Sequence, residues 1–175
     1  ARVDLISKFG RDFLERIKQA GCYQLVLGVE SGTQRILDLV EKGTTPEQAK
    51  ESVRLCKEAG IATKAFYMFG FPTETAQEME QTLAHARELD TDVACFLLVK
   101  AYPGTKMYNQ LAKEQGEGRL QGYSHLQSEV TLPLVGNFDK YHIRNASSFS
   151  NLSNEELVGM LRKAYKIYYP DGRRK

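Results

Sequence analysis

The segment Gln24-Leu25-Val26-Leu27-Gly28-Val29-Glu30, with Ser31-Gly32 directly after it, decides the fold class of this chain. It is an apolar run that ends in a single carboxylate and a glycine-containing turn. Residues 64–69 and 93–99 have the same continuous apolar character, which is typical of strands buried on both faces of a parallel sheet. A helical pattern separates one strand from the next at a spacing of about 40 residues, so the sequence predicts parallel β-α-β units.

Helices are predicted from their start and stop signals. Three capping boxes, in which a Ser or Thr is followed three residues later by Glu or Gln, mark helix starts after Thr45, Thr75 and Ser153. Glycines at positions 21 and 60 mark two helix ends, because glycine adopts the left-handed capping conformation without strain. Further helices are predicted over residues 10–19, 34–41 and 106–115. The polar stretch 116–150 is assigned to no element.

The number of strands limits the architecture. The 175 residues are enough for one domain, yet three strands do not close a barrel, which takes about eight, or six in a partial barrel. Residues 1–105 therefore indicate part of a larger α/β sheet, and residues 106–175 an extension that ends in a helix. Because unpaired strand edges invite pairing, we expect the chain to self-associate through an exposed sheet edge.

Composition excludes several classes of protein. Lys and Arg number 24 and Asp and Glu 22, and a net charge of +2 argues against a nucleic-acid-binding protein. No apolar run approaches the ~20 residues that span a bilayer, so no membrane association is expected. The three cysteines, Cys22, Cys56 and Cys95, include no C-x-x-C pair and are odd in number, which favours a reducing, cytoplasmic compartment over a disulfide framework.

The candidate site residues lie where strands end, because parallel α/β folds bind ligands at the carboxyl edge of the sheet. Glu30 ends an apolar strand, and its two oxygens suit the two hydroxyls of a ribose; the alternative is a carboxylate tied to a neighbouring basic or backbone group. The N–H groups of Ser31 and Gly32 suit an anion or a polar ligand edge, although a plain capping turn is the preferred explanation from the residues alone.

Two further positions are candidates on weaker grounds. Lys42, at the end of a short helix, is a counter-charge for a ligand carboxylate or simply complements the helix dipole. Gly70, Phe71 and Pro72 shape a loop that suits an adenine edge or is only a turn. The histidines have no metal-ligand spacing, His85 is expected at the surface, and no nucleophile motif is present. The residues alone thus indicate a parallel α/β chain with a polar ligand edge.

Several motifs together resemble the radical S-adenosylmethionine (radical SAM) superfamily, and most closely its branch of cobalamin-linked enzymes and anaerobic magnesium-protoporphyrin monomethyl ester cyclases. The motifs that carry this resemblance are Leu27-Gly28-Val29-Glu30-Ser31-Gly32, Ile36-Leu37, Lys42-Gly43-Thr44-Thr45, Phe69-Gly70-Phe71-Pro72-Thr73-Glu74-Thr75, Tyr102-Pro103-Gly104-Thr105, Leu152-Ser153-Asn154-Glu155-Glu156-Leu157 and Tyr168-Tyr169-Pro170. They span nearly the whole chain in a suitable order.

The resemblance implies a fold and a set of roles. The chain would be the carboxyl-terminal half of a partial (β/α)6 barrel, with residues 2–4 closing its third strand and the three strands above as its fourth to sixth. Glu30 would contact the ribose hydroxyls of S-adenosylmethionine, with Ser31 and Gly32 beside it. Lys42 would lie near the methionine carboxylate, and Gly70, Phe71 and Pro72 near the adenine.

The sequence departs from the family pattern at the metal. The family binds a [4Fe–4S] cluster through C-x-x-x-C-x-x-C, which is absent here, and Fe–S ligation needs closely placed thiolates. The resemblance therefore implies the half of the core that lacks the cluster ligands, inactive alone. The intact oxidoreductase would cleave S-adenosylmethionine to a 5′-deoxyadenosyl radical that acts on an unidentified small molecule, with an upstream cobalamin domain possible. The alternatives are a small nucleotide- or sugar-phosphate-binding protein at Ser31-Gly32 and a non-catalytic interaction module.

Overall fold

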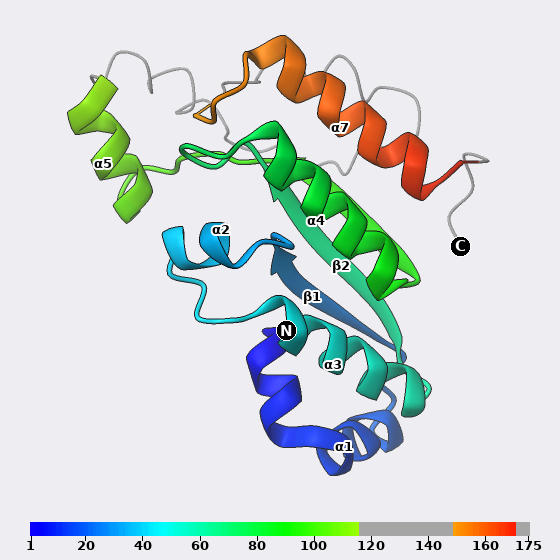
Figure 1. Cartoon of the computed structure of the whole chain (residues 1–175). Coiled ribbons are helices and arrows are strands. Elements are labelled where there is room, and N and C mark those ends of the chain that lie inside the picture. The colour runs from blue at the N-terminus through cyan, green and yellow to red at the C-terminus, as the bar shows by residue number, and fades with distance from the viewer. Residues whose placement is uncertain (116–148, 171–175) are drawn as a thin grey trace.

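A computed structural model describes residues 1–115 and 149–170, which form a three-stranded sheet with helices packed on it (Figure 1). The predicted irregular stretch 116–150 lies outside this description except for its last two residues. The elements in chain order are α1 (Val3–Gln19), β1 (Gln24–Glu30), α2 (Gln34–Leu39), α3 (Pro46–Glu58), β2 (Ala62–Phe69), α4 (Ala76–Leu89), β3 (Val93–Leu98), α5 (Lys106–Gln115) and α7 (Asn154–Tyr168).

The sheet has the order β1-β2-β3 and both strand pairs are parallel, so the predicted β-α-β arrangement is confirmed. Gln24 pairs with Ala62 at the start of the first ladder, and Lys64 pairs with Val93 at the start of the second. The predicted bounds of β1 agree with the structure, whereas β2 begins two residues before the predicted start at residue 64. The three carboxyl ends therefore lie along one edge of the sheet, as the site predictions require.

The amino-terminal end differs from expectation. Arg2 forms a parallel bridge to Gly28, so the chain does begin beside the edge of β1, but Val3 and Asp4 already belong to α1. The predicted strand end at residues 2–4 is thus wrong beyond Arg2. The helix also starts well before residue 10, where a break at Gly10 (φ 67°, ψ −159°) bends it. The apolar periodicity revealed only the part that follows this break.

The predicted helix starts are confirmed by their hydrogen bonds. Each of the Thr45, Thr75 and Ser153 hydroxyls accepts from the backbone N–H three residues ahead. In return, the Gln48 side chain and the carboxylates of Glu78 and Glu156 accept from the capping residues' own N–H groups. Both partners of such a box lie within one turn, which explains why sequence alone locates these three starts.

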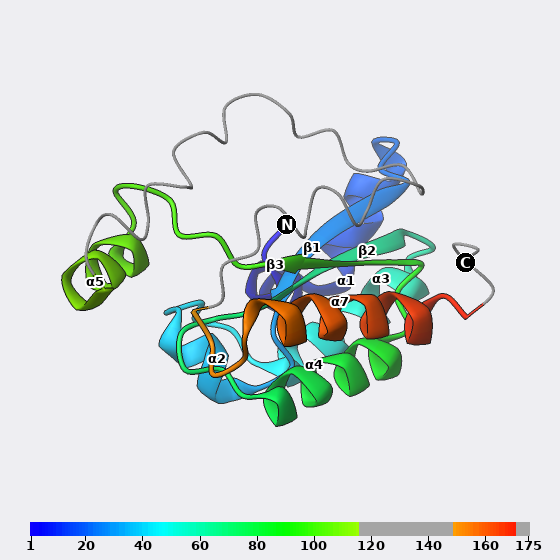
Figure 2. The same cartoon turned by 90° about the horizontal axis from the view of Figure 1, so that it is seen from above.

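The helices cover one face of the sheet. The buried residues of β1, β2 and β3 form one core with apolar side chains of α1, α3, α4 and α7, and Figure 2 shows α4 and α7 running along the same side of the strands. Burial alternates along β2 and β3, so every second side chain points to the opposite face and is only partly buried. This opposite side is called the open face, and its residues are Gln24, Val26, Gly28, Ala62, Lys64, Phe66, Met68, Val93, Cys95 and Leu97.

Two tyrosine side chains, one on α7 and one directly after it, hydrogen-bond the free edge of β3. The Tyr169 hydroxyl accepts from the Ala94 N–H (2.8 Å) and donates to the Ala94 carbonyl (2.9 Å). The Tyr165 hydroxyl makes the same pair of bonds with Phe96, both at 3.1 Å. These are the backbone groups that a further strand would bind. Self-association through an exposed sheet edge stays a prediction. It has no open pairing site at Ala94 or Phe96, because the tyrosine hydroxyls already bind the backbone groups of both residues.

Candidate functional site

Glu30 stands at a break in the ladder where β1 ends. The register between β1 and β2 shifts between Gly28 and Glu30, and Glu30 has the left-handed φ of 68°. This backbone conformation is strained for a residue other than glycine, and residues strained in this way are concentrated at functional sites. The carboxylate folds back over Gly28, because a Cβ added there would lie 2.7 Å from Glu30 Oε1. Glycine at position 28 thus gives the carboxylate its place on the open face.

Lys42 pairs with this carboxylate. Its Nζ donates to Glu30 Oε1 at 2.6 Å, and the two side chains are only 20% and 14% exposed. The Arg2 guanidinium donates to the Lys42 carbonyl at 3.0 Å, which ties the chain start to the turn after α2. The structure thus brings together Glu30 and Lys42, two residues that the sequence proposed separately.

The second oxygen of Glu30 has no partner. Oε2 is buried and makes no hydrogen bond within the part of the chain that the structure describes. A buried carboxylate oxygen without a donor is costly, whereas a hydroxyl or N–H donor from a ligand would remove that cost. The arrangement can therefore accept one or two hydrogen bonds from a bound molecule while Lys42 balances the charge.

Ser31 and Gly32 turn toward α4. The Ser31 side chain is fully buried, and its Oγ lies 3.0 Å from Thr82 Oγ1 and 3.1 Å from Thr33 Oγ1. The Gly32 N–H donates to Thr82 Oγ1 at 3.0 Å, and a Cβ at Gly32 would lie 2.6 Å from the Cβ of His85. These groups are engaged within the chain, and a ligand contact by either residue remains a prediction.

Glu74 organises the loop after β2. It is fully buried, and its Oε2 accepts from the N–H groups of Gly70 (2.7 Å) and Phe71 (3.0 Å). Its Oε1 is buried without a partner in the described residues, and burial raises the Glu74 pKa to about 7. Glu74 directly precedes the capping Thr75 in the sequence, but its carboxylate closes the turn after β2. Gly70 and Phe71 therefore direct these N–H groups inward, while Pro72 remains partly exposed.

Arg35 was missed by the sequence reasoning. Its guanidinium binds both carboxylate oxygens of Glu78, one at 2.8 Å, and also donates to the Thr73 carbonyl and hydroxyl, each at 3.1 Å. The bond from Arg35 holds the pKa of Glu78 down, to about 2. Arg35 thus ties α2 to the loop after β2. The sequence indicates Glu78 only as part of a capping box, because its second partner, Arg35, lies far away along the chain.

The cysteines and histidine do not form a metal site. Cys56 lies in the core, where burial raises its thiol pKa to about 11, while Cys95 lies on the open face. No group of three His, Cys, Asp or Glu residues that could hold a metal occurs within residues 1–115 and 149–170. His85 is buried rather than at the surface as expected, and its Nε2 lies 3.2 Å from the Pro46 carbonyl oxygen between α3 and α4.

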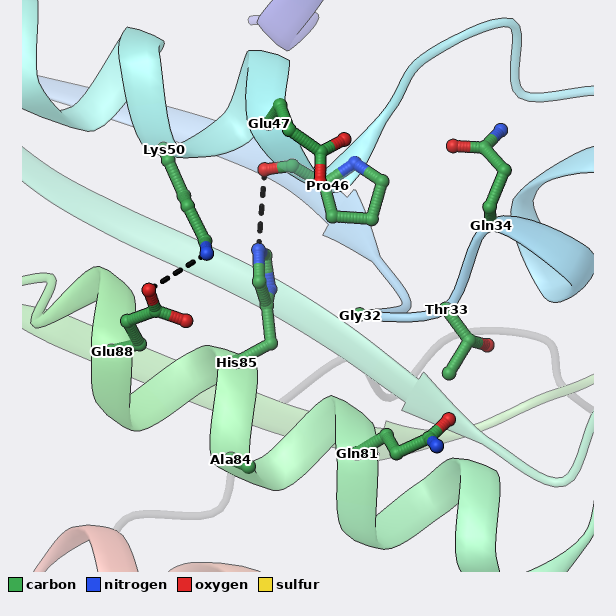
Figure 3. A pocket seen from close by; sticks show the side chains of 10 residues that line it. All are labelled: Gly32, Thr33, Gln34, Pro46, Glu47, Lys50, Gln81, Ala84, His85 and Glu88. Carbon is green, nitrogen blue, oxygen red and sulfur yellow. Dashed lines mark hydrogen bonds and ion pairs between the residues drawn. The ribbon is translucent and has the colours of Figure 1, made fainter.

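A shallow polar groove lies on the helical side of the molecule (Figure 3). Gly32 and His85 are among its lining residues, and the ion pair between Lys50 and Glu88 (2.7 Å) joins α3 to α4 beside it. Neither Glu30 nor Lys42 lines this groove, so it is separate from the carboxyl-edge site. No helix in the described ranges is long and apolar enough to cross a membrane.

Comparison with known proteins gives consistent matches. Residues 2–86 match the family profile of the Radical SAM superfamily. An uncharacterized methyltransferase of Pyrococcus horikoshii is 30% identical over 165 residues, which cover 94% of this chain and 32% of the relative. An anaerobic magnesium-protoporphyrin IX monomethyl ester cyclase of Rubrivivax gelatinosus is 35% identical over 98 residues, 56% of this chain and 18% of the relative. The chain thus spans a third or less of the length of these relatives.

Solved structures agree in fold. The radical S-adenosylmethionine methyltransferase TsrM from Kitasatospora setae, solved with cobalamin and a [4Fe–4S] cluster bound, has a TM-score of 0.58 and 29% identity over 65% of this chain and 22% of its own. The coproporphyrinogen III oxidase HemN of Escherichia coli, a radical SAM enzyme, has a TM-score of 0.53 over 59% of this chain and 23% of its own. At 21% identity, that second likeness concerns the fold alone.

Proposed function

Because residues 2–86 place this chain in the radical SAM superfamily, we propose that it forms the carboxyl-terminal half of the catalytic barrel of a radical SAM oxidoreductase. On this proposal β1, β2 and β3 are the fourth to sixth strands of a partial (β/α)6 barrel. Residues 1–105 belong to the barrel and residues 106–175 form its extension. The parallel bridge between Arg2 and Gly28 supports this order, since a preceding strand would pair with this edge of β1.

The proposed role of this half is to bind the nucleoside part of S-adenosylmethionine. The single observation that carries the proposal is the unpartnered, buried Oε2 of Glu30 at the carboxyl edge of the sheet. The two carboxylate oxygens suit the two vicinal hydroxyls of a ribose, which are both donors. Lys42 holds the carboxylate in place through its ion pair and offers a cation near the methionine carboxylate. Ser31 and Gly32 hold the turn that follows Glu30 against α4.

The loop of Gly70, Phe71 and Pro72 is proposed to face the adenine. Its inward N–H groups are bound to Glu74, so the loop keeps one shape when no ligand is present. A fixed loop offers its carbonyl groups and the ring of Pro72 to a flat base without an ordering cost at binding.

Of the two cofactors proposed for the intact enzyme, one fits the residues of this chain and the other does not. The nucleoside of S-adenosylmethionine fits the orphaned carboxylate oxygen of Glu30. A [4Fe–4S] cluster does not fit Cys22, Cys56 and Cys95, which lie at the α1–β1 turn, in the core and on the open face. Together the cluster and S-adenosylmethionine supply one-electron radical chemistry when bound. We therefore propose that the cluster ligands, and any cobalamin site, lie outside this sequence and that the chain alone is inactive. The proposed compartment is the cytoplasm.

The alternative anion site at Ser31-Gly32 has less support. Such a site needs free N–H groups at a helix start, but the Gly32 N–H is already bound to Thr82.

The test is a titration of the chain with 5′-methylthioadenosine, which has the ribose and adenine of S-adenosylmethionine and needs no cluster. NMR shifts report even millimolar affinity. The Glu30→Gln variant should bind about tenfold or more weakly, because it loses bonds to a charged acceptor. Glu15→Gln, an exposed ion-pair residue on α1, is the matched control and should bind as the wild type does. Equal affinity of all three proteins would overturn the proposal.

A further inference from the structure

Among the open-face residues of the strands, Lys64 has the one charged side chain, and it lies on the central strand β2. Lys64 points to this face from β2, with Phe66 and Met68 following it on the same side of the strand. Its Nζ lies 5.1 Å from the centroid of the Phe66 ring. No carboxylate in residues 1–115 and 149–170 lies within ion-pair distance of it, although ten ion pairs occur among those residues.

The lysine reaches the same layer of the sheet as the Glu30 site. Phe66 pairs with Gly28 on one side and with Cys95 on the other, so these three residues form one row across the sheet. The carboxylate of Glu30 and the ammonium of Lys42 lie over Gly28, and the Lys64 ammonium lies over Phe66. Two cations and one carboxylate therefore share this layer, which leaves an excess of one positive charge.

We propose that the open face binds a molecule with a flat or elongated apolar body and one anionic group, a carboxylate or a phosphate, and that Lys64 holds the anion. The inference rests on the proposed function and names the substrate class for the same site. Phe66, Met68 and Leu97 contact the apolar body, and the flexible thioether of Met68 adapts to its shape. The ring of Phe66 keeps the ammonium in position by a cation–π contact until the anion arrives.

Charge complementarity is the reason for choosing this occupant. A lysine on the central strand of a largely apolar sheet face gives no packing advantage over the apolar residues around it, and desolvating it without a partner is costly. A neutral occupant would desolvate Lys64 without compensation, and a cationic one would add repulsion. An occupant with one anionic group neutralises the excess charge and covers the apolar residues at the same time.

The test compares two fluorescent probes with the same ring system. 1-Anilinonaphthalene-8-sulfonate carries one anionic group, whereas N-phenyl-1-naphthylamine is its neutral counterpart. The Lys64→Gln variant should bind the sulfonate about tenfold more weakly, with the neutral probe unchanged, because only the charged bond is lost. Lys64→Arg keeps the charge and should retain affinity for the sulfonate. Lys8→Gln is the matched control, since Lys8 also lies over a phenylalanine ring, Phe9, but on α1.

Competitors identify the anion. Displacement of the sulfonate by 2-naphthoate assigns a carboxylate and displacement by 2-naphthyl phosphate assigns a phosphate, while 2-naphthol should displace it poorly. The inference is overturned if Lys64→Gln binds both probes as the wild type does, if it loses both equally, or if neither anionic competitor acts. Circular dichroism confirms that each variant is folded. Binding of 5′-methylthioadenosine depends on Glu30 and not on Lys64, so each proposal can fail without the other.

Discussion

Replacing Tyr165 and Tyr169 with phenylalanine removes two hydroxyl groups from the edge of β3 and leaves both rings in place. Each hydroxyl accepts from one backbone N–H and donates to the carbonyl of the same residue, so the double variant loses four hydrogen bonds. A net contribution of about 0.5–1.5 kcal/mol per bond would give a maximum near 6 kcal/mol. Water reaches this partly exposed edge and replaces part of the loss, so we expect about 2 kcal/mol.

The loss should also change the association state. Ala94 and Phe96 then present two adjacent sets of edge N–H and carbonyl groups, which another strand can bind. Urea unfolding should show the destabilisation, and sedimentation velocity should show more association than the wild type shows at the same concentration. Tyr23→Phe is the control, because that ring is 78% exposed. A loss below about 0.5 kcal/mol with an unchanged sedimentation profile would refute the capping role of the two hydroxyls.

Three further perturbations test the site. Gly28→Ala places a Cβ 2.7 Å from Glu30 Oε1, so it should displace the carboxylate and lower the affinity for 5′-methylthioadenosine, at a small cost in stability because the side chain that must move is flexible. The Glu74 pKa is raised to about 7 in the folded chain, so the folded state binds the proton more tightly than the unfolded state. This difference stabilises the fold fully below the pKa that Glu74 has in the unfolded chain, and the contribution is lost as pH rises to 7. Glu74→Gln should therefore become more stable than the wild type by a few kcal/mol between pH about 5 and 8 in urea unfolding, whereas a constant difference would contradict the raised pKa. Arg35→Lys keeps the charge but loses the two-oxygen contact with Glu78, and should cost about 1 kcal/mol of stability. The Glu78 pKa should rise as well, so that the remaining contribution of this pair is lost at a higher pH on acidification.

Local signals predicted much of the fold. The bounds of β1 and the three capping boxes follow from residues within one strand or one helical turn, and the structure confirms them. The repeat of apolar strands and helices also sufficed for a parallel sheet. The early start of α1 was missed because its first turns are separated from the apolar pattern by the left-handed Gly10.

Contacts between segments that are far apart in the sequence could not be predicted from it. The Tyr165 and Tyr169 hydroxyls bind a strand about 70 residues earlier, and no local pattern links either residue to that strand. The burial of His85 depends on α3 packing against α4, and the role of Glu74 depends on how the turn at Gly70 folds back. In each case the partner is set by tertiary packing, which no local pattern encodes.

The candidate site was predicted in part. Glu30 and Lys42 were chosen for separate reasons, and the structure places them in one ion pair. The left-handed φ of Glu30 and the need for glycine at position 28 became visible only with the backbone in view.

The most direct test of the central claim is a double-mutant cycle between Glu30 and the ribose hydroxyls. Binding of 5′-methylthioadenosine and of its 2′,3′-dideoxy analogue would be measured on the wild type and on Glu30→Gln. If this carboxylate receives those hydroxyls, the coupling energy should be about 1.5 kcal/mol or more, and the analogue should not distinguish the two proteins. Additive losses, with a coupling near zero, would contradict the assignment.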